Sequence, residues 1–292
     1  MKNKDFAAFI LTHGRPDNVI TYKTLKKAGY TGKIYIIIDN EDKTGEQYYK
    51  NFGKENVIIF DKKAIAKTVD NGDNFNDLRT TTHVRNAIFE IAKKLNIIYF
   101  IQLDDDYTSF NFTSDENFNY KRKATRIKNI NYIFDALLTF YKKTNILSIC
   151  MAQGGDFIGG ENSGVLEKGL SRKAMNSFIC STKRPFKFIS RLNEDVNTYM
   201  SLGAKGDVFI TTPLLRLEQK ETQTNVGGMS ETYIDNGTYI KSFFTVMYCP
   251  SFTKVALMGY TKQRLHHRIS WKNAVPVILD EKYKKWNKKN RK

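Results

Sequence analysis

The chain has 292 residues, and its 47 Lys and Arg residues outnumber its 30 Asp and Glu residues to give a formal net charge of +17. Hydrophobic residues make up 41% and aromatic residues 13%, which is ample apolar surface to bury and excludes a chain that is disordered throughout. The longest apolar runs, such as Phe6–Leu11 and Ile34–Ile38, fall far short of the roughly 18–20 residues of a membrane-spanning helix, so no such helix is expected.

The first 110 residues alternate short apolar runs, typical of buried strands, with amphipathic stretches typical of helices. In chain order we predict the strand Phe6–Leu11, a helix from Pro16 to about Ala28, the strand Lys33–Ile38, a short helix near Gly45–Phe52, the strand Val57–Phe60, a helix over Leu78–Leu95 and the strand Ile97–Leu103. This order predicts an α/β fold with a parallel sheet between helices. Ligands bind at the carboxyl ends of such strands, where Asp39, Asp61 and Asp104–Asp106 stand, with His13 and Arg15 after the first strand.

The second half is less regular and predicts a mixed arrangement. We predict helices over Ile127–Tyr141 and Asn193–Leu202, and strands at Ile146–Met151, Phe178–Cys180, Val208–Thr211 and Ser242–Tyr248. Two glycine-rich segments, 153–160 and 227–230, lack the spacing of a phosphate-binding or dinucleotide motif, so we expect mobile loops over a site. Neither a repeat nor a linker divides the chain, and we therefore expect one continuous domain.

The run Asp104-Asp105-Asp106 carries the most chemical information. Three carboxylates directly after a buried strand repel one another unless a cation neutralises them. Mg²⁺ and Mn²⁺ prefer oxygen ligands, and Mg²⁺ is commonly held by one or two carboxylates together with substrate phosphates. The alternative is a solvated acidic turn, but the apolar strand immediately before the run favours a metal site.

Other motifs stand in a fixed order around this run. Arg85-Asn86 lies on the helix before the strand, and the strand leads into an Asp-x-Asp signature; in this the chain resembles nucleotide-sugar glycosyltransferases of the GT-A fold over about residues 5–210. The opening Phe-Ile-Leu-Thr-His-Gly-Arg-Pro-Asp-Asn and the later Tyr-Ile-Ile-Ile-Asp-Asn-Glu-Asp look like a narrower family, the phage TET-associated glycosyltransferases, which act on hydroxymethylated pyrimidines in DNA. That narrower match rests mainly on the first 42 residues.

The resemblance implies a GT-A-like domain over 1–292, with a nucleotide-sugar-binding half at 1–110, an acceptor-binding half at 111–280 and a basic tail at 281–292. The donor-binding residues it implies are Thr12, His13, Arg15, Asp39, Arg79, Arg85, Asp104 and Asp105. Asp104 would face the ribose or the metal, and Asp106 the metal and the diphosphate. Either Arg79 or Arg85 would reach the diphosphate, since Arg offers a bidentate fork. The alternatives are a salt bridge for Arg85 and a structural turn for His13.

Two later motifs complete the implied site. Glu194-Asp195 stands where inverting GT-A enzymes present a general base to the acceptor, and a carboxylate there would take the proton of the acceptor hydroxyl. Its alternative is plain capping of a helix N-terminus. The segment 264–268 offers His266 or His267 as a further metal ligand, although the sequence does not choose between them and a basic surface stretch is the alternative.

The implied reaction moves a sugar, most often glucose, from a UDP-sugar to the hydroxymethyl group of a pyrimidine base in DNA, with Mn²⁺ or Mg²⁺ bound. The charge of +17 and the abundant Tyr and Phe suit a DNA acceptor, because cations contact its backbone and aromatic rings stack on bases. Two other classes stay open: a GT-A enzyme with a carbohydrate or lipid-linked acceptor, and a non-catalytic basic DNA-binding protein whose acidic run is structural.

Charge and cysteine content bear on location and partners. The tail 281–292 has seven basic residues and one acid, and so supplies +6 of the +17; it is either a solubilising appendage or a polyanion contact. Three scattered cysteines match neither a disulfide framework nor a zinc motif. Because the N-terminal residues also lack the apolar core of a signal peptide, we expect a cytoplasmic protein, in the host's cytoplasm for a phage-encoded chain.

Overall fold

The computed structural model describes residues 4–168, 173–220, 229–237, 239–258 and 263–274. The strands are β1 (Phe6–Leu11), β2 (Lys33–Asp39), β3 (Val57–Phe60), β4 (Tyr99–Asp104), β5 (Tyr107–Ser114), β6 (Tyr120–Arg126), β7 (Ser148–Gln153), β8 (Ser177–Ser181), β9 (Phe209–Gln219), β10 (Thr253–Met258) and β11 (Arg264–Ile269). The α-helices are α1 (Ile20–Lys27), α2 (Gly45–Phe52), α3 (Lys62–Ala66), α4 (Thr82–Lys94), α5 (Ile130–Lys143), α6 (Gly164–Lys168), α7 (Glu194–Gly203), α8 (Met229–Asn236), α9 (Ile240–Tyr248) and α10 (Trp271–Ala274). Short 3-10 helices are η1 (Lys54–Asn56), η2 (Gly154–Phe157) and η3 (Gly160–Asn162).

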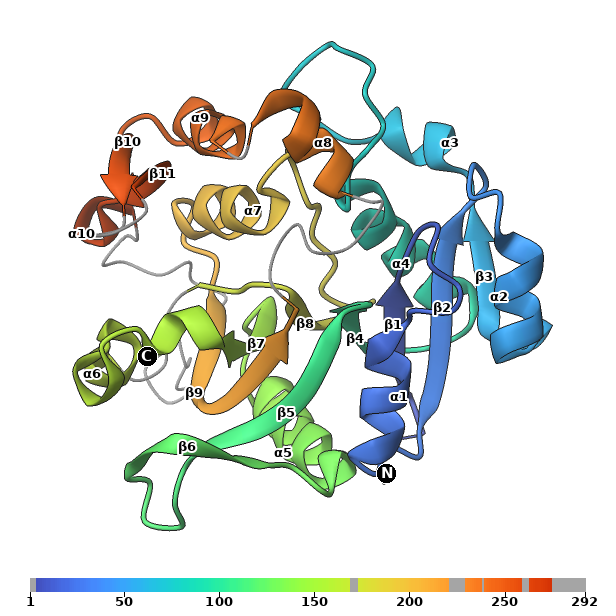
Figure 1. The fold of residues 1–292 in the computed structure, drawn as a ribbon, viewed down its shortest axis with the longest axis horizontal. Coiled ribbons are helices and arrows are strands. Elements are labelled where there is room, and N and C mark those ends of the chain that lie inside the picture. Colours follow the sequence, from blue (N-terminus) through green and yellow to red (C-terminus); the bar gives the residue numbers. More distant parts are fainter. Residues whose placement is uncertain (1–3, 169–172, 221–228, 238, 259–262, 275–292) are drawn as a thin grey trace, which may run out of the picture.

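A nine-stranded sheet in the order β3-β2-β1-β4-β8-β7-β9-β5-β6 organises the fold (Figure 1). β3, β2, β1 and β4 are parallel, β8 pairs antiparallel with both β4 and β7, and β9 is parallel to β7 but antiparallel to β5. The predicted α/β class is therefore confirmed, with a parallel first half and a mixed second half. Strands from both halves of the chain share this one sheet.

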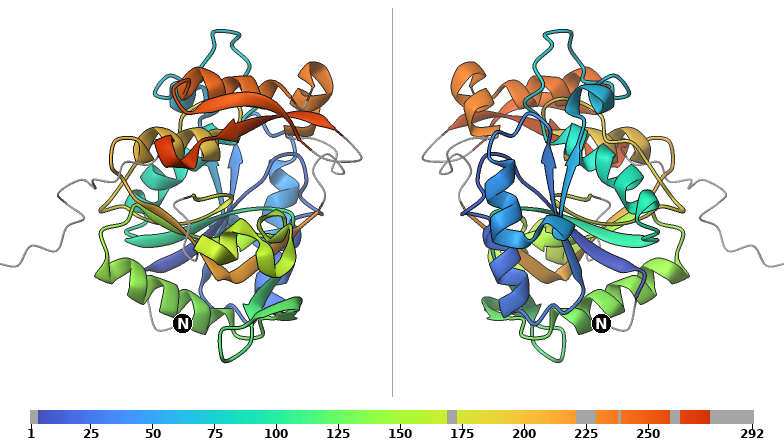
Figure 2. Two further views of the ribbon diagram at one scale, coloured as in Figure 1. Left: turned by 90° about the vertical axis from the view of Figure 1, so that its left-hand side faces the viewer. Right: turned by 90° about the vertical axis from the view of Figure 1, so that its right-hand side faces the viewer.

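The apolar runs of the parallel strands are explained by burial on both faces. In β1, the residues Phe6, Ala8 and Ile10 join one core cluster, which includes Phe134 of α5. The alternate residues of β1 join a second cluster with α4 and α7, because successive strand side chains point to opposite faces. In Figure 2, α5 lies on one side of the sheet and α4 and α7 on the other, while α9 and the β10-β11 pair form a further layer over α7.

Three predicted helices begin three or four residues later than their sequence signals indicate. α1 begins at Ile20 and not at Pro16, α4 begins at Thr82 and not at Leu78, and α5 begins at Ile130 and not at Ile127. In the first case, a turn in which the Asn18 amide donates to the Arg15 carbonyl precedes the helix. The predicted strands at β1 to β4, β7 and β8 are confirmed to within two residues, and β9 begins as expected but runs on to Gln219.

The predicted strand Ser242–Tyr248 is wrong, because this segment belongs to the helix α9. Its run of apolar residues resembles a buried strand, but Phe243 and Met247 are exposed. The buried residues of α9 are Ser242, Phe244 and Thr245, and the two exposed residues are four positions apart, which fits the helical period and not the alternation of a strand. The length of the apolar run therefore misled the prediction, and its spacing is the better signal.

The hairpin β5-β6 and the pair β10-β11 are not predicted by the sequence patterns. β6 is an edge strand that reads Tyr-Lys-Arg-Lys-Ala-Thr-Arg, and its charged side chains protect the edge against further pairing while hiding any apolar alternation. The glycine-rich segment 153–160 contains η2 and the start of η3. Of the segment 227–230, Met229 and Ser230 begin α8, and residues 227–228, like the tail 281–292, lie outside the described residues.

Candidate active site

A cleft of about 1310 Å³ opens at the carboxyl ends of β1, β2 and β4. The opposite side of the cleft is formed by the first residues of α7, by Gln219 at the end of β9 and Lys220 after it, and by side chains of α8 and α9. The site residues predicted from sequence that line it are Thr12, His13, Arg15, Asp39, Arg79, Arg85, Asp104, Asp105, Asp106, Glu194 and Asp195. The cleft thus lies where an α/β sheet is expected to bind its ligand. Asp61 is elsewhere, where its carboxylate caps α3 by accepting from the Ala64 amide.

His13 and Asp39 form the outer end of this cleft. The His13 Nδ1 and the Asp39 carboxylate are 2.8 Å apart, and the Lys62 ammonium donates to the same carboxylate oxygen at 3.5 Å. The hydrogen bond to Asp39 raises the pKa of His13 above its ordinary value, against the opposing effect of burial. Burial alone would raise the pKa of Asp39, but the hydrogen bond from His13 and the charge of Lys62 hold it below its usual range. Asp39 is therefore ionised and fixed in orientation at neutral pH.

Thr12 and Arg15 hold the middle acid of the Asp104–Asp106 run. The Thr12 hydroxyl donates to Asp105 at 2.6 Å, and the Arg15 guanidinium donates to it at 3.1 Å. Tyr48, on α2, lies 3.1 Å from the Thr12 hydroxyl and accepts from the Arg15 amide at 2.9 Å. Asp105 is thus a structural anchor between β1 and β4, and the two acids beside it remain for other partners.

Asp104 and Asp106 both have pKa values well above the ordinary value of an aspartate. Burial, together with the charges of Glu194 and Asp105, raises the pKa of Asp104 to about 6 although Arg85 opposes this. Burial and the charges of Asp104 and Asp105 raise the pKa of Asp106 to about 7. Among the described residues, no cationic side chain forms an ion pair with Asp106. The run therefore carries more negative charge than its protein partners neutralise, as the donor set of a cation would.

The residues present fit a hard divalent cation that is held partly by its substrate. Within the described ranges, no three His, Cys, Asp or Glu side chains converge into a complete ligand set. The carboxylates of Asp104 and Asp106 would hold such a cation together with a diphosphate and water, which is the usual manner of binding Mg²⁺. The chemistry of the oxygen donors agrees with Mg²⁺ or Mn²⁺.

His266 and His267 lie on β11 and are not among the residues that line the cleft, although Arg264 of the same strand is. The His267 ring is 3.3 Å from the Asn193 amide nitrogen, next to Glu194. Burial and the neighbouring His266 lower the pKa of His267 to about 3, so its imidazole is neutral at pH 7. The structure does not bring either histidine into a three-ligand set with Asp104 and Asp106.

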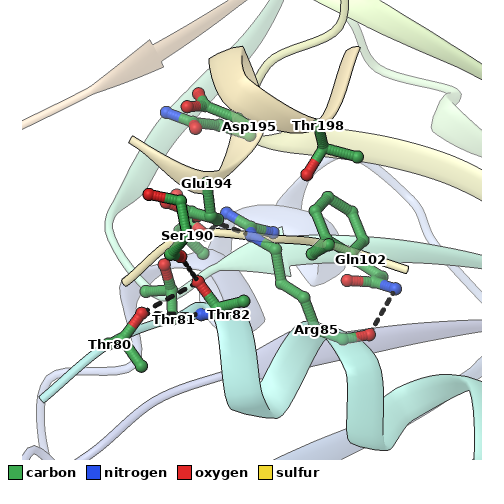
Figure 3. A network of polar contacts seen from close by, with 12 residues as sticks. Thr80, Thr81, Thr82, Arg85, Gln102, Ser190, Glu194, Asp195 and Thr198 are labelled. Atoms are coloured by element: carbon green, nitrogen blue, oxygen red, sulfur yellow. Dashed lines mark hydrogen bonds and ion pairs between the residues drawn. The ribbon is translucent and has the colours of Figure 1, made fainter. Parts of the chain in front are cut away.

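Arg85 connects Asp104 of β4 with Glu194 of α7, and Figure 3 shows its side chain reaching from α4 toward Glu194. Its side chain is 1% exposed, and its guanidinium donates to Asp104 at 2.8 Å and to Glu194 at 2.9 Å. The rings of Phe178 and Phe188 lie 5.1 Å and 5.8 Å from it. Arg85 therefore forms salt bridges, which was the alternative considered for it. Through them it orients Asp104 at the end of β4 and Glu194 at the start of α7.

Arg79 likewise has carboxylate partners. It donates to Asp77 at 3.0 Å and to Asp235 of α8 at 2.5 Å, while 37% of its side chain is exposed at the cleft. Asp77 also accepts from Arg191, which is 2% exposed and pairs with Asp73 as well. The polar stretch before α4 is therefore tied to the segment that leads into α7.

Glu194 and Asp195 differ in their surroundings. The Glu194 Oε1 accepts from Thr81 at 2.6 Å and from Arg85, so its orientation is fixed. Asp195 is 6% exposed, and its carboxylate accepts from the Val196 amide at 2.7 Å. Burial and the charge of Glu194 raise the pKa of Asp195 to about 7. A carboxyl with that pKa can both accept and release a proton near neutral pH.

Sequence reasoning missed several cleft residues because they come from distant elements. Lys62 pairs with Asp39 and Thr81 holds Glu194, while Tyr48, which is buried and does not itself line the cleft, holds Thr12. Lys241 of α9 also lines the cleft, where burial lowers its pKa. The run Thr80-Thr81-Thr82 before α4 was a usable signal, since clustered hydroxyls favour the ends of helices and hydrogen bonds to nearby groups.

The mixed sheet and the acid-lined cleft at its strand ends form an α/β arrangement in which a ligand is expected to bind at the carboxyl ends of the parallel strands. A family model for the TET-associated glycosyltransferases matches residues 6–228. The chain therefore belongs to the TET-associated glycosyltransferase family. No curated protein sequence gives a significant match. Among the described residues, no helix is both long and apolar enough to cross a membrane.

Solved structures with a similar arrangement include glucosyl-3-phosphoglycerate synthase from Mycobacterium tuberculosis in complex with Mn²⁺, UDP and phosphoglyceric acid. That structure is 8% identical to this chain, with a TM-score of 0.46 and coverage of 90% of this chain and 86% of the other. The same enzyme with Mg²⁺ and UDP gives 9% identity, a TM-score of 0.42 and coverage of 90% and 87%. Similarity at this level assigns neither a ligand nor a residue role to this chain.

Proposed function

We propose that this protein transfers a sugar, with glucose as the expected unit, from a UDP-sugar to the hydroxymethyl group of a pyrimidine base in DNA, with Mn²⁺ or Mg²⁺ bound. The observation that carries the proposal is the family membership, because the TET-associated glycosyltransferases that the sequence resembles act on hydroxymethylated pyrimidines in DNA. The cleft geometry supports it through two opposed walls. The donor wall is Thr12, His13, Asp39 and Asp104–Asp106, and the acceptor wall is Glu194, Asp195, Tyr233 and Lys241.

On the donor wall, His13 and Asp39 present a fixed hydrogen-bonding edge to the nucleoside, while Asp104 and Asp106 face the diphosphate side of the site. A divalent cation bound by these two acids would stabilise the negative charge on the departing diphosphate. Arg85 keeps Asp104 ionised in part by its own charge, so the acid remains available as a ligand. The domain halves expected from sequence, 1–110 for donor binding and 111–280 for acceptor binding, are proposed on the same grounds.

On the acceptor wall, we assign the general base to Asp195 in an inverting transfer. The acceptor oxygen forms a bond to the anomeric carbon, the bond from that carbon to the diphosphate breaks, and Asp195 takes the hydroxyl proton. Glu194 is less suited because Oε1 already accepts two hydrogen bonds, from Thr81 and Arg85. Its role is to hold the start of α7 against α4, which positions Asp195.

The test is mass spectrometry of hydroxymethylated duplex DNA incubated with the protein, Mn²⁺ and a panel of nucleotide sugars. We expect a gain of one sugar mass on 5-hydroxymethylcytosine or 5-hydroxymethyluracil with a UDP-sugar, and none on unmodified DNA. Transfer to an oligosaccharide or to a lipid-linked acceptor alone would favour the second class of enzyme. If no donor is cleaved under any condition, the protein is not acting as an enzyme on these substrates, and the proposal is wrong.

A further inference from the structure

A second, smaller hollow lies beside the cleft. It has a volume of about 200 Å³ and is bounded by α1, by Thr108 at the start of β5 and by Arg126 at the end of β6. Lys23 and Lys27 line it from α1, where their spacing of four residues places them on one face of the helix. All three cationic side chains are exposed. α1 and β5 are in direct contact, and Figure 1 shows them side by side.

The hollow is continuous with the cleft, because Asp17 and Asn18 line both. These two residues belong to the turn between β1 and α1, the stretch that the sequence predicts as helix but the structure leaves outside it. An extended molecule that places one unit in the cleft can therefore pass over Asp17 and Asn18 into the hollow. A compact donor has no such need, since its diphosphate is expected beside Asp104 and Asp106.

The charge of this hollow is positive and largely uncompensated. In the described parts of the chain, Lys23, Lys27 and Arg126 take part in no ion pair. The single acid that lines the hollow, Asp17, accepts a hydrogen bond from the Asn51 side chain at 2.9 Å. Positive charge continues along the edge strand β6, where Lys121, Arg122 and Lys123 are also exposed.

From this arrangement we infer that the hollow binds the sugar-phosphate backbone of the DNA strand next to the base that enters the cleft. The inference rests on the proposed function and names the part of the surface that would hold its acceptor. A strand of nucleotides matches both features, because it is linear and carries a regularly spaced negative charge. A flat anionic membrane matches the charge but not the concave shape.

The test replaces the three cations together in Lys23→Gln, Lys27→Gln, Arg126→Gln and measures DNA binding against salt concentration. On duplex DNA, log affinity falls with log salt at a slope of about −0.9 for each phosphate contact. Losing three contacts would therefore make the slope shallower by about 2.7. We expect the KM for hydroxymethylated DNA to rise at least about tenfold at moderate salt while kcat at saturating DNA is retained. The melting temperature of the variant, which should match that of the wild type, checks that the fold is intact.

The matched control is Lys93→Gln, Lys94→Gln, Lys143→Gln, which removes the same charge from exposed residues at the C-terminal ends of α4 and α5. α4 connects back to the start of β4, so Lys93 and Lys94 lie at the edge of the sheet opposite the cleft. We expect this control to keep both the salt slope and the KM. An equal loss in both variants would mean that net charge and not the hollow governs binding, and the inference would be overturned.

The remaining outcomes separate this inference from the proposed function. If the wild-type protein modifies DNA but the triple variant in the hollow keeps the wild-type slope and KM, the inference alone is wrong. If the wild type neither binds nor modifies hydroxymethylated DNA, the proposed function and the inference fall together. Loss of binding to phosphatidylserine vesicles in the variant, with DNA binding unchanged, would assign the hollow to a membrane surface and also overturn the inference.

Discussion

The two walls of the cleft are built in different ways. The donor wall collects the ends of β1, β2 and β4, which are adjacent parallel strands, and most of its polar groups have fixed partners such as His13 with Asp39. The acceptor wall is assembled from α7, α8 and α9 and places Asp195 in a buried setting with the Val196 amide as its hydrogen-bond donor. The donor wall is thus pre-organised to bind, whereas the acceptor wall holds a carboxyl that is able to exchange a proton.

The largest effect should come from removing a donor-wall acid. We predict that Asp106→Asn reduces transfer by at least about a thousandfold, since stabilising the charge of the leaving group is worth several kcal/mol. Its thermal stability should hold or rise at neutral pH, because one of three mutually repelling carboxylates is gone. Initial rates with saturating Mn²⁺ and thermal melting measure both quantities. Near-normal turnover would remove Asp106 from the metal site.

The acceptor wall should respond in turnover and pH dependence. We predict that Asp195→Asn loses 10²–10⁴ in kcat, the usual value of a positioned general base. In the wild type, kcat should rise with pH through about 7, because the base must be ionised, and this rise should be absent from the residual activity of the variant. Glu194→Gln, the comparison variant, should keep a kcat that rises with pH, but with its midpoint at lower pH, because the charge of Glu194 contributes to the raised pKa of Asp195. A pH-independent wild-type kcat between pH 5 and 8 would contradict the assignment.

Asp195 should also leave a signature in stability. Its pKa in the folded protein lies above the ordinary value of 3.8, so the carboxyl favours folding most at low pH, and this contribution is lost as pH rises through about 7. The stability of Asp195→Asn relative to the wild type should therefore be greater at pH 8 than at pH 4. Denaturant unfolding at the two pH values measures the difference, and the opposite sign would show that the carboxyl is not buried as described.

Arg85 connects the two walls through its ion pairs with Asp104 and Glu194, so its removal should destabilise both walls. We predict that Arg85→Met costs about 3–5 kcal/mol of unfolding free energy at pH 7, because Asp104 and Glu194 lose their shared buried cation. The loss should shrink at lower pH as the carboxyls become protonated. Arg79→Met is the control: its ion pairs are partly exposed, and their loss should cost only about 0–1 kcal/mol. Equal costs would mean that Arg85 is not the buried connection.

The smallest effect concerns the basic tail. We predict that truncation after Asp280 makes the plot of log DNA affinity against log salt shallower, by about 0.9 for each phosphate that the tail contacts on duplex DNA. The truncation should not change kcat. Fluorescence anisotropy of labelled duplex DNA over a range of salt concentrations measures this slope. An unchanged slope would leave the tail as a solubilising segment and confine acceptor binding to the folded surface.

The contrast between the walls also explains what the sequence could predict. Asp39 and Asp104–Asp106 were predictable because each ends an apolar strand, and neighbouring parallel strands bring their ends together. The pairing of Arg85 with Glu194 spans 109 residues and depends on how α7 packs over α4, for which no local pattern exists. Lys62 and Tyr48 could not be predicted either, because their contacts with Asp39 and Thr12 also join residues that are distant in sequence.

The acceptor wall was also where secondary structure was mispredicted. The segment Ser242–Tyr248 is apolar enough for a buried strand, but it lies on the surface of α7 as a helix, and only its spacing shows this. The turns before α1 and α4 contain residues that a local pattern favours as helical. In the structure these turns lie outside the helices, and their residues Arg15 and Arg79 line the cleft. Tertiary contacts override local preference at these positions.

The most direct test of the division between the walls is calorimetric titration of UDP with Mn²⁺ into the wild type, Asp106→Asn and Asp195→Asn. We predict that Asp195→Asn binds UDP with the affinity of the wild type while it fails to transfer sugar, and that Asp106→Asn loses most of its Mn²⁺-dependent affinity. If Asp195→Asn loses donor affinity to the same extent as Asp106→Asn, the two walls do not have separate roles and the account is contradicted.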